Sequence, residues 1–369
     1  AIVAEFAHTV YRFGHSMLTE TVARTDDTGV NQDIPLLDAF LNPLAFNEVG
    51  TTASEAAGSI VRGMTDQVGN ELDEFVTEAL RNRLLGLPLD LATINIARGR
   101  DTGVPTLNDA RRQFFDATGN SAVAPYESWA DFELGLRHPE SLVNFIAAYG
   151  THPFIATFDD GGLDGPGSLE ARRAAATIML AANDPLTPPD SLDFLLGIGA
   201  WANLPSGATV TGLDNVDFWV GGMAEKQAPF GGLLGSTFNH VFETQLEDLQ
   251  DGDRFYYLTR TAGLNLLVQL EGNSFSELIM RNTDAEGLPA DVFSRAVFTF
   301  NLAFLGATGP ILNDPTTPYD ESTMLDLRRM PNGAIRYTGP AHVIWNGRNT
   351  LDVDRIVSSE GEIVSDNEG

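Results

Sequence analysis

Two histidines and one arginine lie close together near the start of the chain, within residues 5–15, EFAHTVYRFGH. The apolar residues among them predict a helix over residues 1–24. In such a helix His8, Arg12 and His15 share one face, because positions i, i+4 and i+7 return to the same stripe. A histidine among apolar side chains can ligate the iron of a porphyrin, and a nearby guanidinium can pair with a propionate. We predict His15 as the iron ligand, with His8 as its rival in this helix.

Residues 91–105, LATINIARGRDTGVP, supply the groups that such a ligand needs. A ligating histidine is held in one tautomer by a partner at its second ring nitrogen. Asn95 can accept that N–H, and a neutral amide pulls less electron density onto the imidazole than a carboxylate would. Arg98 follows three residues later on the same helical face and can meet the second propionate. Arg12, Asn95 and Arg98 are therefore the predicted cofactor-binding residues.

Several other charged and aromatic residues are predicted to be structural. Arg100 and Asp101 precede a glycine and a proline, a setting in which an adjacent pair of opposite charges commonly fixes a loop, and we place Arg111 in the same class. The runs NVDFWVGGMAE, at 215–225, and DGDRFYY, at 251–257, are rich in aromatic residues. Such residues usually pack in a core, so we expect both runs to serve the scaffold.

Four of these segments resemble motifs of the animal-type haem peroxidases, the peroxidase–cyclooxygenase superfamily, and follow the order that the family has. The motifs are YRFGHS at 11–16, NxxRxRDxGxP at 95–105, DxWxGG at 217–222 and DGDRF at 251–255. The resemblance covers about residues 1–315 and suggests a bacterial member. It implies a mainly α, myeloperoxidase-like fold with little β structure, and a haem as the cofactor.

The resemblance implies a haem peroxidase, an oxidoreductase that uses hydrogen peroxide to oxidise a halide or a small aromatic or phenolic donor. In that family the distal catalytic residues and a calcium-binding loop precede the proximal histidine, whereas His15 is almost at the start of this sequence. We therefore expect an incomplete C-terminal part that carries the proximal half of the site, is inactive alone and contains no distal catalytic residue. Calcium is a second candidate cofactor for the full-length protein.

Two other functions stay open at this point. A fatty-acid dioxygenase of the same superfamily would need a tyrosine that becomes a radical near the haem, and Tyr11 lies on the predicted ligand helix. A non-catalytic, secreted, calcium-dependent surface module would keep the fold without the reaction. Oxygen uptake with linoleate in the absence of peroxide would distinguish the first alternative, and calcium-driven folding without haem uptake would distinguish the second.

Composition limits the partners of the protein. The 369 residues carry a formal net charge of −29, so nucleic acid and anionic membrane surfaces, which attract basic patches, are poor partners. The absence of cysteine excludes disulfides and thiolate metal sites and fits a secreted bacterial protein. No stretch has the length and apolarity of a transmembrane helix. We expect an extracellular protein that meets peroxide and a small electron donor; its oligomeric state is open.

By this resemblance residues 1–340 are the C-terminal portion of a haem peroxidase domain, and residues 341–369 are an acidic tail, either solvated or the lead-in to calcium-binding repeats. Residues 296–313, free of charge, are interpreted as buried core. Strands are predicted only at 334–337 and 342–345. The further predicted helices are 51–85, 91–98, 114–149 with breaks, 168–182 capped by Ser168, 191–197 capped by Asp190, 233–249 and 253–270.

The remaining histidines carry no chemistry in this interpretation. His138, His152, His240 and His342 are isolated in the sequence, and isolated histidines are mostly on the surface or satisfied by neighbours. The stretch between Arg112 and Asn215 is long compared with vertebrate members of the resembled family. Its loops either shape access to the site or decorate the surface.

Overall fold

The computed structural model describes most of residues 1–288 and, beyond them, residue 292 and the backbone of short strands. Up to residue 288 the description omits 41, 47–50, 82–83, 85–86, 163, 182–183, 230–231, 261–265 and 287. The chain divides into two compact units. Unit 1 contains residues 1–18 and 70–256, and unit 2 contains residues 19–69 and 257–369. Most of the predicted core at 296–313 lies outside the described residues.

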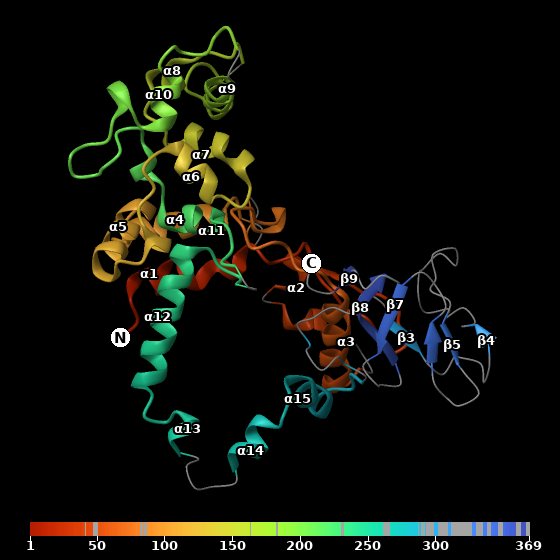
Figure 1. Cartoon of the computed structure of the whole chain (residues 1–369). Helices are drawn as coiled ribbons and strands as arrows, with labels where there is room; N and C mark the ends of the chain where they lie inside the picture. Colours follow the sequence, from red (N-terminus) through yellow and green to blue (C-terminus); the bar gives the residue numbers. More distant parts are fainter. Residues whose placement is uncertain are drawn as a thin grey trace. The chain divides into compact units, whose positions relative to one another are not determined.

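Unit 1 is built from helices (Figure 1). Its α-helices are α1 Ala4–His8, α4 Leu91–Asp101, α5 Leu107–Thr118, α6 Trp129–Gly135, α7 Leu142–Tyr149, α8 Pro153–Thr157, α9 Leu169–Leu180, α10 Ser191–Leu196, α11 Phe218–Ala224 and α12 Ser236–Gly252. Its 3₁₀ helices are η1 Val10–His15, η3 Glu78–Leu80, η5 Ser121–Val123, η6 Pro139–Ser141, η7 Gly199–Trp201 and η8 Leu213–Asn215. The predicted mainly α fold is confirmed.

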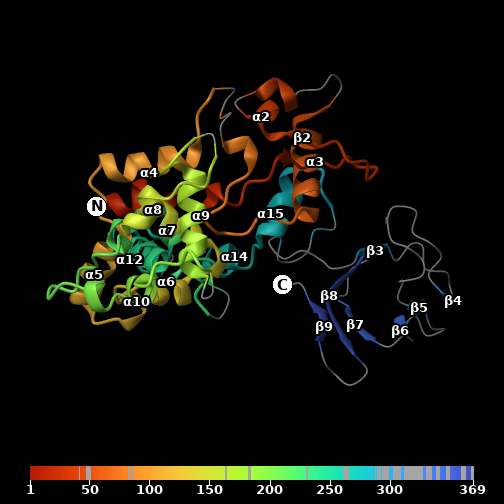
Figure 2. The same ribbon diagram turned by 90° about the horizontal axis from the view of Figure 1, so that it is seen from above.

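Unit 2 combines short helices and antiparallel strands (Figure 2). The helices are α2 Leu36–Ala39, η2 Pro43–Phe46, α3 Ala53–Asp66, α13 Tyr257–Arg260, α14 Leu266–Glu271 and α15 Phe275–Asn282. The strands are β1 Thr21–Val22, β2 Ile34–Pro35, β3 Thr299–Asn301, β4 Gly309–Pro310, β5 Leu327–Arg329, β6 Ile335–Tyr337, β7 Ala341–Trp345, β8 Thr350–Ser358 and β9 Ile363–Asp366. β1 pairs with β2, β8 pairs with β3, β7 and β9, and β5 lies between β4 and β6. The two predicted strands correspond to β6 and β7, and the predicted boundary at residue 340 stays a prediction.

Two predicted helices begin with a side-chain cap, of which the sequence predicted only Ser168. The side chain of Asp90 accepts a hydrogen bond from the Thr93 amide at 2.8 Å and begins α4. Ser168 accepts one from the Ala171 amide at 3.2 Å and begins α9, as predicted. These bonds satisfy amides that have no partner inside the helix.

Three predictions about helices are wrong. Residues 1–24 are not one helix, because α1 ends at His8 and Thr9 leaves helical geometry, with φ −129° and ψ −73°. The helix predicted over 51–85 ends at Asp66, and the described apolar residues that follow lie mostly in non-helical backbone, with the 3₁₀ turn η3 among them. Asp190 precedes α10 but makes no capping bond, because its carboxylate binds His152 and Trp201 instead.

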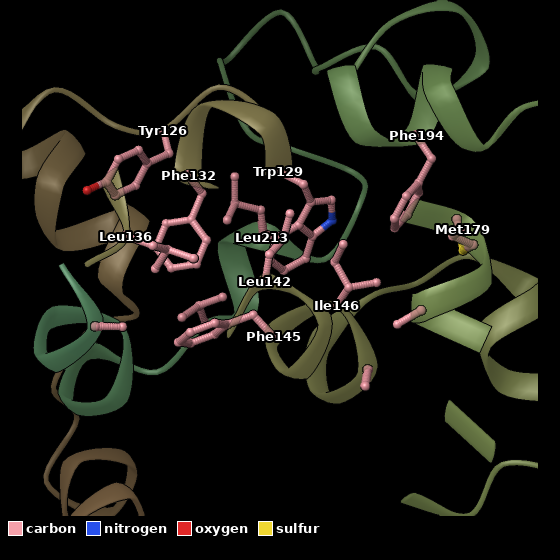
Figure 3. Close-up of a cluster of buried hydrophobic side chains, with 14 of the residues drawn as sticks. Tyr126, Trp129, Phe132, Leu136, Leu142, Phe145, Ile146, Met179, Phe194 and Leu213 are labelled. Atoms are coloured by element: carbon pink, nitrogen blue, oxygen red, sulfur yellow. The ribbon is translucent and has the colours of Figure 1, made fainter. Parts of the chain in front are cut away.

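The larger core of unit 1 lies between α5, α6, α7, α9, α10 and η8. Figure 3 shows Trp129, Phe132, Phe145 and Ile146 converging with Leu213, while Met179 and Phe194 approach from α9 and α10. Burial of such large side chains contributes roughly 1.5–3 kcal/mol each relative to exposure. This core therefore holds α9 and α10 onto the rest of the unit.

Residues 152–210 form an excursion within unit 1 whose two ends lie side by side. The Thr151 amide donates to the Thr211 carbonyl at 3.2 Å, and the Thr151 hydroxyl donates to the Val210 carbonyl at 2.8 Å. The indole N–H of Trp129 also donates to the Thr211 carbonyl, at 3.2 Å. Residues 152–210, which belong to the long stretch between Arg112 and Asn215, thus form an excursion whose two ends are joined by hydrogen bonds.

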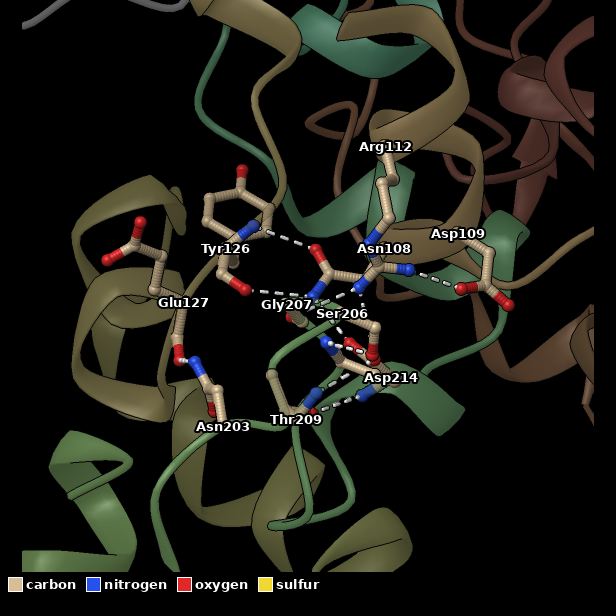
Figure 4. A network of polar contacts seen from close by, with 11 residues as sticks. Asn108, Asp109, Arg112, Tyr126, Glu127, Asn203, Ser206, Gly207, Thr209 and Asp214 are labelled. Atoms are coloured by element: carbon tan, nitrogen blue, oxygen red, sulfur yellow. Dashed lines mark hydrogen bonds and ion pairs between the residues drawn. The ribbon is translucent and has the colours of Figure 1, made fainter. Parts of the chain in front are cut away.

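A polar network fixes the chain just after this excursion (Figure 4). The Asn108 amide group donates to Asp214 at 2.7 Å and to the Tyr126 carbonyl at 2.8 Å, and it accepts from the Tyr126 amide at 2.8 Å. Arg112 donates to the other oxygen of Asp214 at 3.1 Å. Because these groups are largely buried and paired, they set the position from which α11 starts.

Candidate functional site

A second core positions the segment that contains His15. Phe6 and Val10 are buried together with Phe238 and Val241 of α12. The Val3 amide donates to the buried side chain of Gln245 at 2.8 Å. These contacts fix α1 and η1 on unit 1. In the 3₁₀ helix η1, residues three apart share a face, so Arg12 and His15 lie on one side although the longer helix does not form.

The structure brings His15 and Asn95 together. The side-chain nitrogen Nδ2 of Asn95 lies 2.9 Å from Nδ1 of His15. Asn95 is fully buried on α4, and His15 is half-buried. The two orientations of an asparagine amide have the same shape, so either its oxygen or its nitrogen can face the ring. The oxygen suits a protonated Nδ1 and the nitrogen suits an unprotonated one. The structure thus places the predicted partner, Asn95, at Nδ1 of His15, but with its nitrogen toward the ring, whereas the prediction has its oxygen accept the ring N–H.

The surroundings of His15 favour the neutral imidazole. Burial lowers the pKa of His15, the nearby charges of Arg12 and Arg98 lower it further, and only the hydrogen bond to Asn95 acts in the opposite direction. A neutral ring is the form that ligates a metal, because a protonated imidazole has no free lone pair. The surroundings of His15 therefore favour the charge state that ligation requires.

Two guanidinium groups lie close to this ring without a carboxylate partner. Arg12 donates to the carbonyl of His8 at 3.1 Å, and its pKa is lowered by burial and by the charge of Arg98. Arg98 is exposed on α4. Neither forms an ion pair in the part of the chain that the structure describes. In a chain of net charge −29, two unpaired cations beside one histidine form a local site for an anionic group.

The donor set fits a haem. Asn95 leaves its buried oxygen Oδ1 without a hydrogen-bond partner among the described residues. This oxygen is the atom that would accept the N–H of a ligating imidazole after the amide turns over. Arg12 and Arg98 supply cations for two propionates. Haem iron needs a neutral nitrogen ligand with a hydrogen-bond acceptor behind it, and the haem propionates need cations. The residues named above offer each of these groups.

The structural residues form different pairs from those predicted. Arg100 does not pair with its neighbour Asp101; its guanidinium binds Asp217 at 2.7 and 2.6 Å, and Tyr149 also donates to Asp217, at 2.7 Å. Adjacent residues on a helix point in different directions, so Arg100 reaches across to the start of α11. The predicted structural role of Arg100 holds with another partner.

Arg111 has a structural role, as predicted. It forms a buried ion pair with Glu225 at 2.7 Å. Glu225 also accepts from the hydroxyl groups of Tyr126, at 3.0 Å, and Thr237, at 2.6 Å. The two ends of the 215–225 motif thus anchor α11 to α4 and α5, and the scaffold role expected for this motif is borne out.

The remaining described histidines are engaged elsewhere. His138 lies 3.2 Å from Glu71 and 3.3 Å from Asp73. The His152 ring accepts from the Phe154 amide at 3.1 Å and contacts Asp190 at 3.2 Å, and His240 packs on Phe114 with ring centroids 4.7 Å apart. Asn95 contacts His15 and not His8, the rival ligand. The side chain of His342 lies outside the description.

The mainly α fold, with the histidine–asparagine pair on η1 and α4, agrees with the resemblance noted in the sequence. A profile of the family described as animal haem peroxidase matches residues 1–155 and 211–293, more than half of the chain. The chain belongs to the animal haem peroxidase family. The unmatched interval, 156–210, lies inside the excursion closed by Thr151 and Thr211.

Individual relatives are distant and longer. Peroxinectin A of Dictyostelium discoideum is 24% identical over 77% of this chain and 39% of its own length. Thyroid peroxidase of Sus scrofa is 26% identical over 78% of this chain and 24% of its own length. Eosinophil peroxidase of Homo sapiens is 24% identical over 80% of this chain and 33% of its own length. The chain thus spans well under half the length of these relatives. The structure of Peroxidase A from Dictyostelium discoideum aligns with a TM-score of 0.49 and 23% identity, over 79% of this chain and 42% of that one.

Sequence reasoning missed the residues behind Asn95. Thr106, Asp217 and Trp219 line one cavity with Asn95. Trp219 was interpreted only as core, and its indole N–H is buried without a partner. The spacing of polar atoms in a tertiary cavity leaves no periodic signal in a sequence, so only the fold could reveal it.

Proposed function

We propose that this chain supplies the proximal side of a haem peroxidase site, with His15 as the axial ligand. The contact between His15 and Asn95 carries the proposal, because it places a fully buried neutral acceptor group behind a half-buried ring. Membership of the animal haem peroxidase family supports the same reaction class. The distal base and cation that peroxide cleavage requires are not assigned to any residue of this chain.

When bound, haem iron would supply the reduction of hydrogen peroxide and the oxidation of a donor, here a halide or a small aromatic or phenolic molecule. The chain's own residues orient the ligand. After the Asn95 amide turns over, its oxygen would accept the Nδ1 proton of His15, which would leave the Nε2 lone pair for the iron. Because an amide carries no charge, the imidazole keeps less anionic character than it would beside a carboxylate.

Arg12 and Arg98 would hold the two propionates. Their like charges lie near each other and near His15, so an anion between them removes a repulsion as well as forming charge-assisted hydrogen bonds. Calcium in the complete protein and an extracellular location belong to the same proposal. No described helix is long and apolar enough to cross a membrane.

The dioxygenase alternative gains no support from the position of Tyr11. Its side chain is 68% exposed and packs at its inner edge against Phe6, with ring centroids 5.7 Å apart. A tyrosyl radical for hydrogen abstraction needs a tyrosine held beside a substrate channel. We therefore propose only the peroxidase reaction.

Haem titration of the chain, followed by visible absorption, tests the proposal. We expect a saturable histidine-type Soret band in the parent chain, its loss in His15→Ala, and its retention in His240→Ala, which removes a histidine that packs on Phe114. Absence of any band that depends on His15 would contradict the proposal. Circular dichroism of each variant establishes that the fold is kept.

A further inference from the structure

One histidine of unit 1 lies against two carboxylates from a distant part of the sequence. Glu71 and Asp73 precede η3, and His138 comes immediately before η6. The Nε2 atom of His138 lies 3.2 Å from Glu71 Oε2 and 3.3 Å from Asp73 Oδ2. One ligand atom from each of the three residues lies within 4.8 Å of the other two. This Glu71–Asp73–His138 cluster shares no residue with the proposed haem site.

The contacts inside the cluster are not hydrogen bonds. His138 Nε2 is buried without a hydrogen-bond partner among the described residues, although two carboxylate oxygens lie within 3.3 Å of it. Asp73 is only 7% exposed; its Oδ1 accepts from the Phe75 amide at 2.9 Å, and its Oδ2 accepts no hydrogen bond in the described chain. Buried polar atoms are nearly always paired, so a nitrogen and an oxygen that approach each other without sharing a proton need another partner.

The spacing of the three atoms suits ligands around one metal ion. Ligands about 2.1 Å from a tetrahedral centre lie about 3.4 Å apart. The distances of 3.2 and 3.3 Å from His138 to the two carboxylates are close to that value. A protonated imidazole would instead donate to one carboxylate at about 2.7–2.9 Å with its N–H aimed at the oxygen.

The charges around the cluster favour a cation. Arg137 lies 3.2 Å from Glu71 and offsets that carboxylate. Glu74 adjoins Asp73 and has a buried oxygen, Oε2, without a partner in the described chain; burial raises the pKa of Glu74, and the charge of Asp73 acts in the same direction. The carboxylates of Asp73, Glu74 and Glu140 thus remain beside a single imidazole. A divalent cation would offset this excess of negative charge.

We propose that Glu71, Asp73 and His138 bind one divalent transition-metal ion, with Zn²⁺ as the probe that tests it. One imidazole nitrogen and two carboxylate oxygens form a donor set that zinc takes in proteins, whereas calcium takes oxygen ligands. Three protein ligands leave a further position for water. The ion joins residues 71–73 to the turn before η6, so its role is to hold these two segments of unit 1 together.

Calorimetric titration of the haem-free chain with Zn²⁺ at about pH 7.5, where histidine is mostly neutral, tests the site. We expect a single ion to bind with a micromolar or lower dissociation constant. His138→Ala and Asp73→Asn should weaken binding at least about 100-fold, since even the loss of a partner behind a ligand costs roughly 10–100-fold. His240→Ala, which removes a histidine that packs on Phe114, and Glu247→Gln, which removes an exposed charge of α12, should match the parent.

Thermal unfolding gives a second measurement that does not depend on haem. An ion that binds only the folded chain raises the unfolding midpoint. Saturating Zn²⁺ should therefore raise the midpoint of the parent and leave that of His138→Ala unchanged. If Asp73→Asn, a change at a buried residue, does not fold, Glu71→Gln replaces it, because the Glu71 side chain is 55% exposed.

Three results would overturn the inference. The first is a folded parent chain that does not bind Zn²⁺. The second is binding that persists unchanged in the cluster variants, because a chain of net charge −29 attracts cations without a built site. The third is calcium that displaces Zn²⁺ at equal concentration, which would contradict the nitrogen ligand. Because His15 is intact in every variant, none of these results bears on the proposed haem site.

Discussion

Asn95 is the residue on which the site depends, because it fixes the second nitrogen of the proposed ligand from a fully buried position. We expect Asn95→Leu, which keeps the volume and removes both polar atoms, to weaken haem binding by roughly 10–100-fold, the usual effect of removing a partner behind a metal ligand. Absorption titration gives the dissociation constant. Thr93→Ala, an exposed change on the same helix, should leave it unaltered. Equal losses in both variants would show that damage to the helix, and not the amide, is responsible.

Arg12 and Arg98 act as propionate anchors in this account. Replacing either by glutamine should reduce haem affinity by about tenfold, since a charge-assisted hydrogen bond contributes about 1.5–3 kcal/mol before solvent screening. The histidine-type spectrum should persist because His15 is intact. Arg173→Gln, an exposed arginine on α9, is the matched control for loss of one positive charge. Affinities that fall equally in all three variants would indicate a general charge effect.

The lowered pKa of His15 gives the haem-free chain a pH signature. The unfolded chain binds a proton at this residue below about pH 6.5, whereas the folded chain resists it until a lower pH. In that window the unfolded state holds more protons, so stability falls as the pH falls through it. Urea unfolding of the parent and His15→Gln at several pH values measures the difference, and the parent should show the steeper acid loss. Parallel stability curves for the two chains would contradict the assigned direction.

At the scale of elements, close packing explains the paired glycines of the 217–222 motif. A Cβ added to Gly222 would lie 2.2 Å from the ring of Phe238, and one added to Gly221 would lie 2.7 Å from Leu107. Helices α11 and α12 can therefore approach only where side chains are missing. The paired glycines mark the place where α11 contacts its neighbouring helices. The motif is therefore easy to recognise in the sequence because of packing, although it carries no chemistry.

Gly222→Ala should destabilise unit 1 by about 1–3 kcal/mol, because the buried Phe238 ring has to move. Gly252→Ala, at the end of α12 with nothing within 4 Å of the added carbon, should be neutral or slightly stabilising. Chemical denaturation of the two variants gives the comparison. Equal stabilities would contradict the packing argument.

Element boundaries were predictable where capping chemistry is local and failed where tertiary contacts decide. Ser168 was predicted as the cap of α9, and the start of α4 at Leu91 was also predicted, although its cap Asp90 was not. The break at Thr9 was not predictable, because the apolar residues around it keep a helical period while packing against α12. The sequence located Asp190 correctly at the start of α10 but predicted a capping role that it does not have. Its partners His152 and Trp201 are tertiary neighbours, which the sequence does not reveal.

At the scale of the whole molecule, the motif order predicted that His15 and Asn95 form a pair, whereas the cavity lined by Asn95, Thr106, Asp217 and Trp219 could be found only from the fold. His15 and Asn95 are 80 residues apart and meet only because α1, η1 and α4 pack in unit 1. Arg100 with Asp217, 117 residues apart, shows the same limit, because sequence adjacency suggested Asp101 instead. Polar groups that pair across a long stretch of sequence leave no local pattern. The pairing of His15 with Asn95 was therefore predicted from the resemblance to a family.

The excursion of residues 152–210 should be separable from the site. Its ends are joined by the hydrogen bonds of Thr151 with Val210 and Thr211. Replacing 152–210 by a short glycine–serine linker should leave haem affinity unchanged while lowering the unfolding midpoint, because Ile146 and Trp129 lose cover from Met179 and Phe194. Titration and thermal unfolding of the shortened chain measure both. Loss of haem binding in a folded shortened chain would contradict the separation.

Resonance Raman spectroscopy of the ferrous haem complex shows directly whether His15 binds the iron and whether Asn95 acts on that bond. We expect an iron–histidine stretching band in the parent chain, its disappearance in His15→Ala, and a shift to higher frequency in Asn95→Asp, where a carboxylate makes the imidazole a stronger donor to the iron. A band that persists in His15→Ala would show that another residue binds the iron. A band whose frequency is the same in Asn95→Asp as in the parent would show that Asn95 does not act on the ligand.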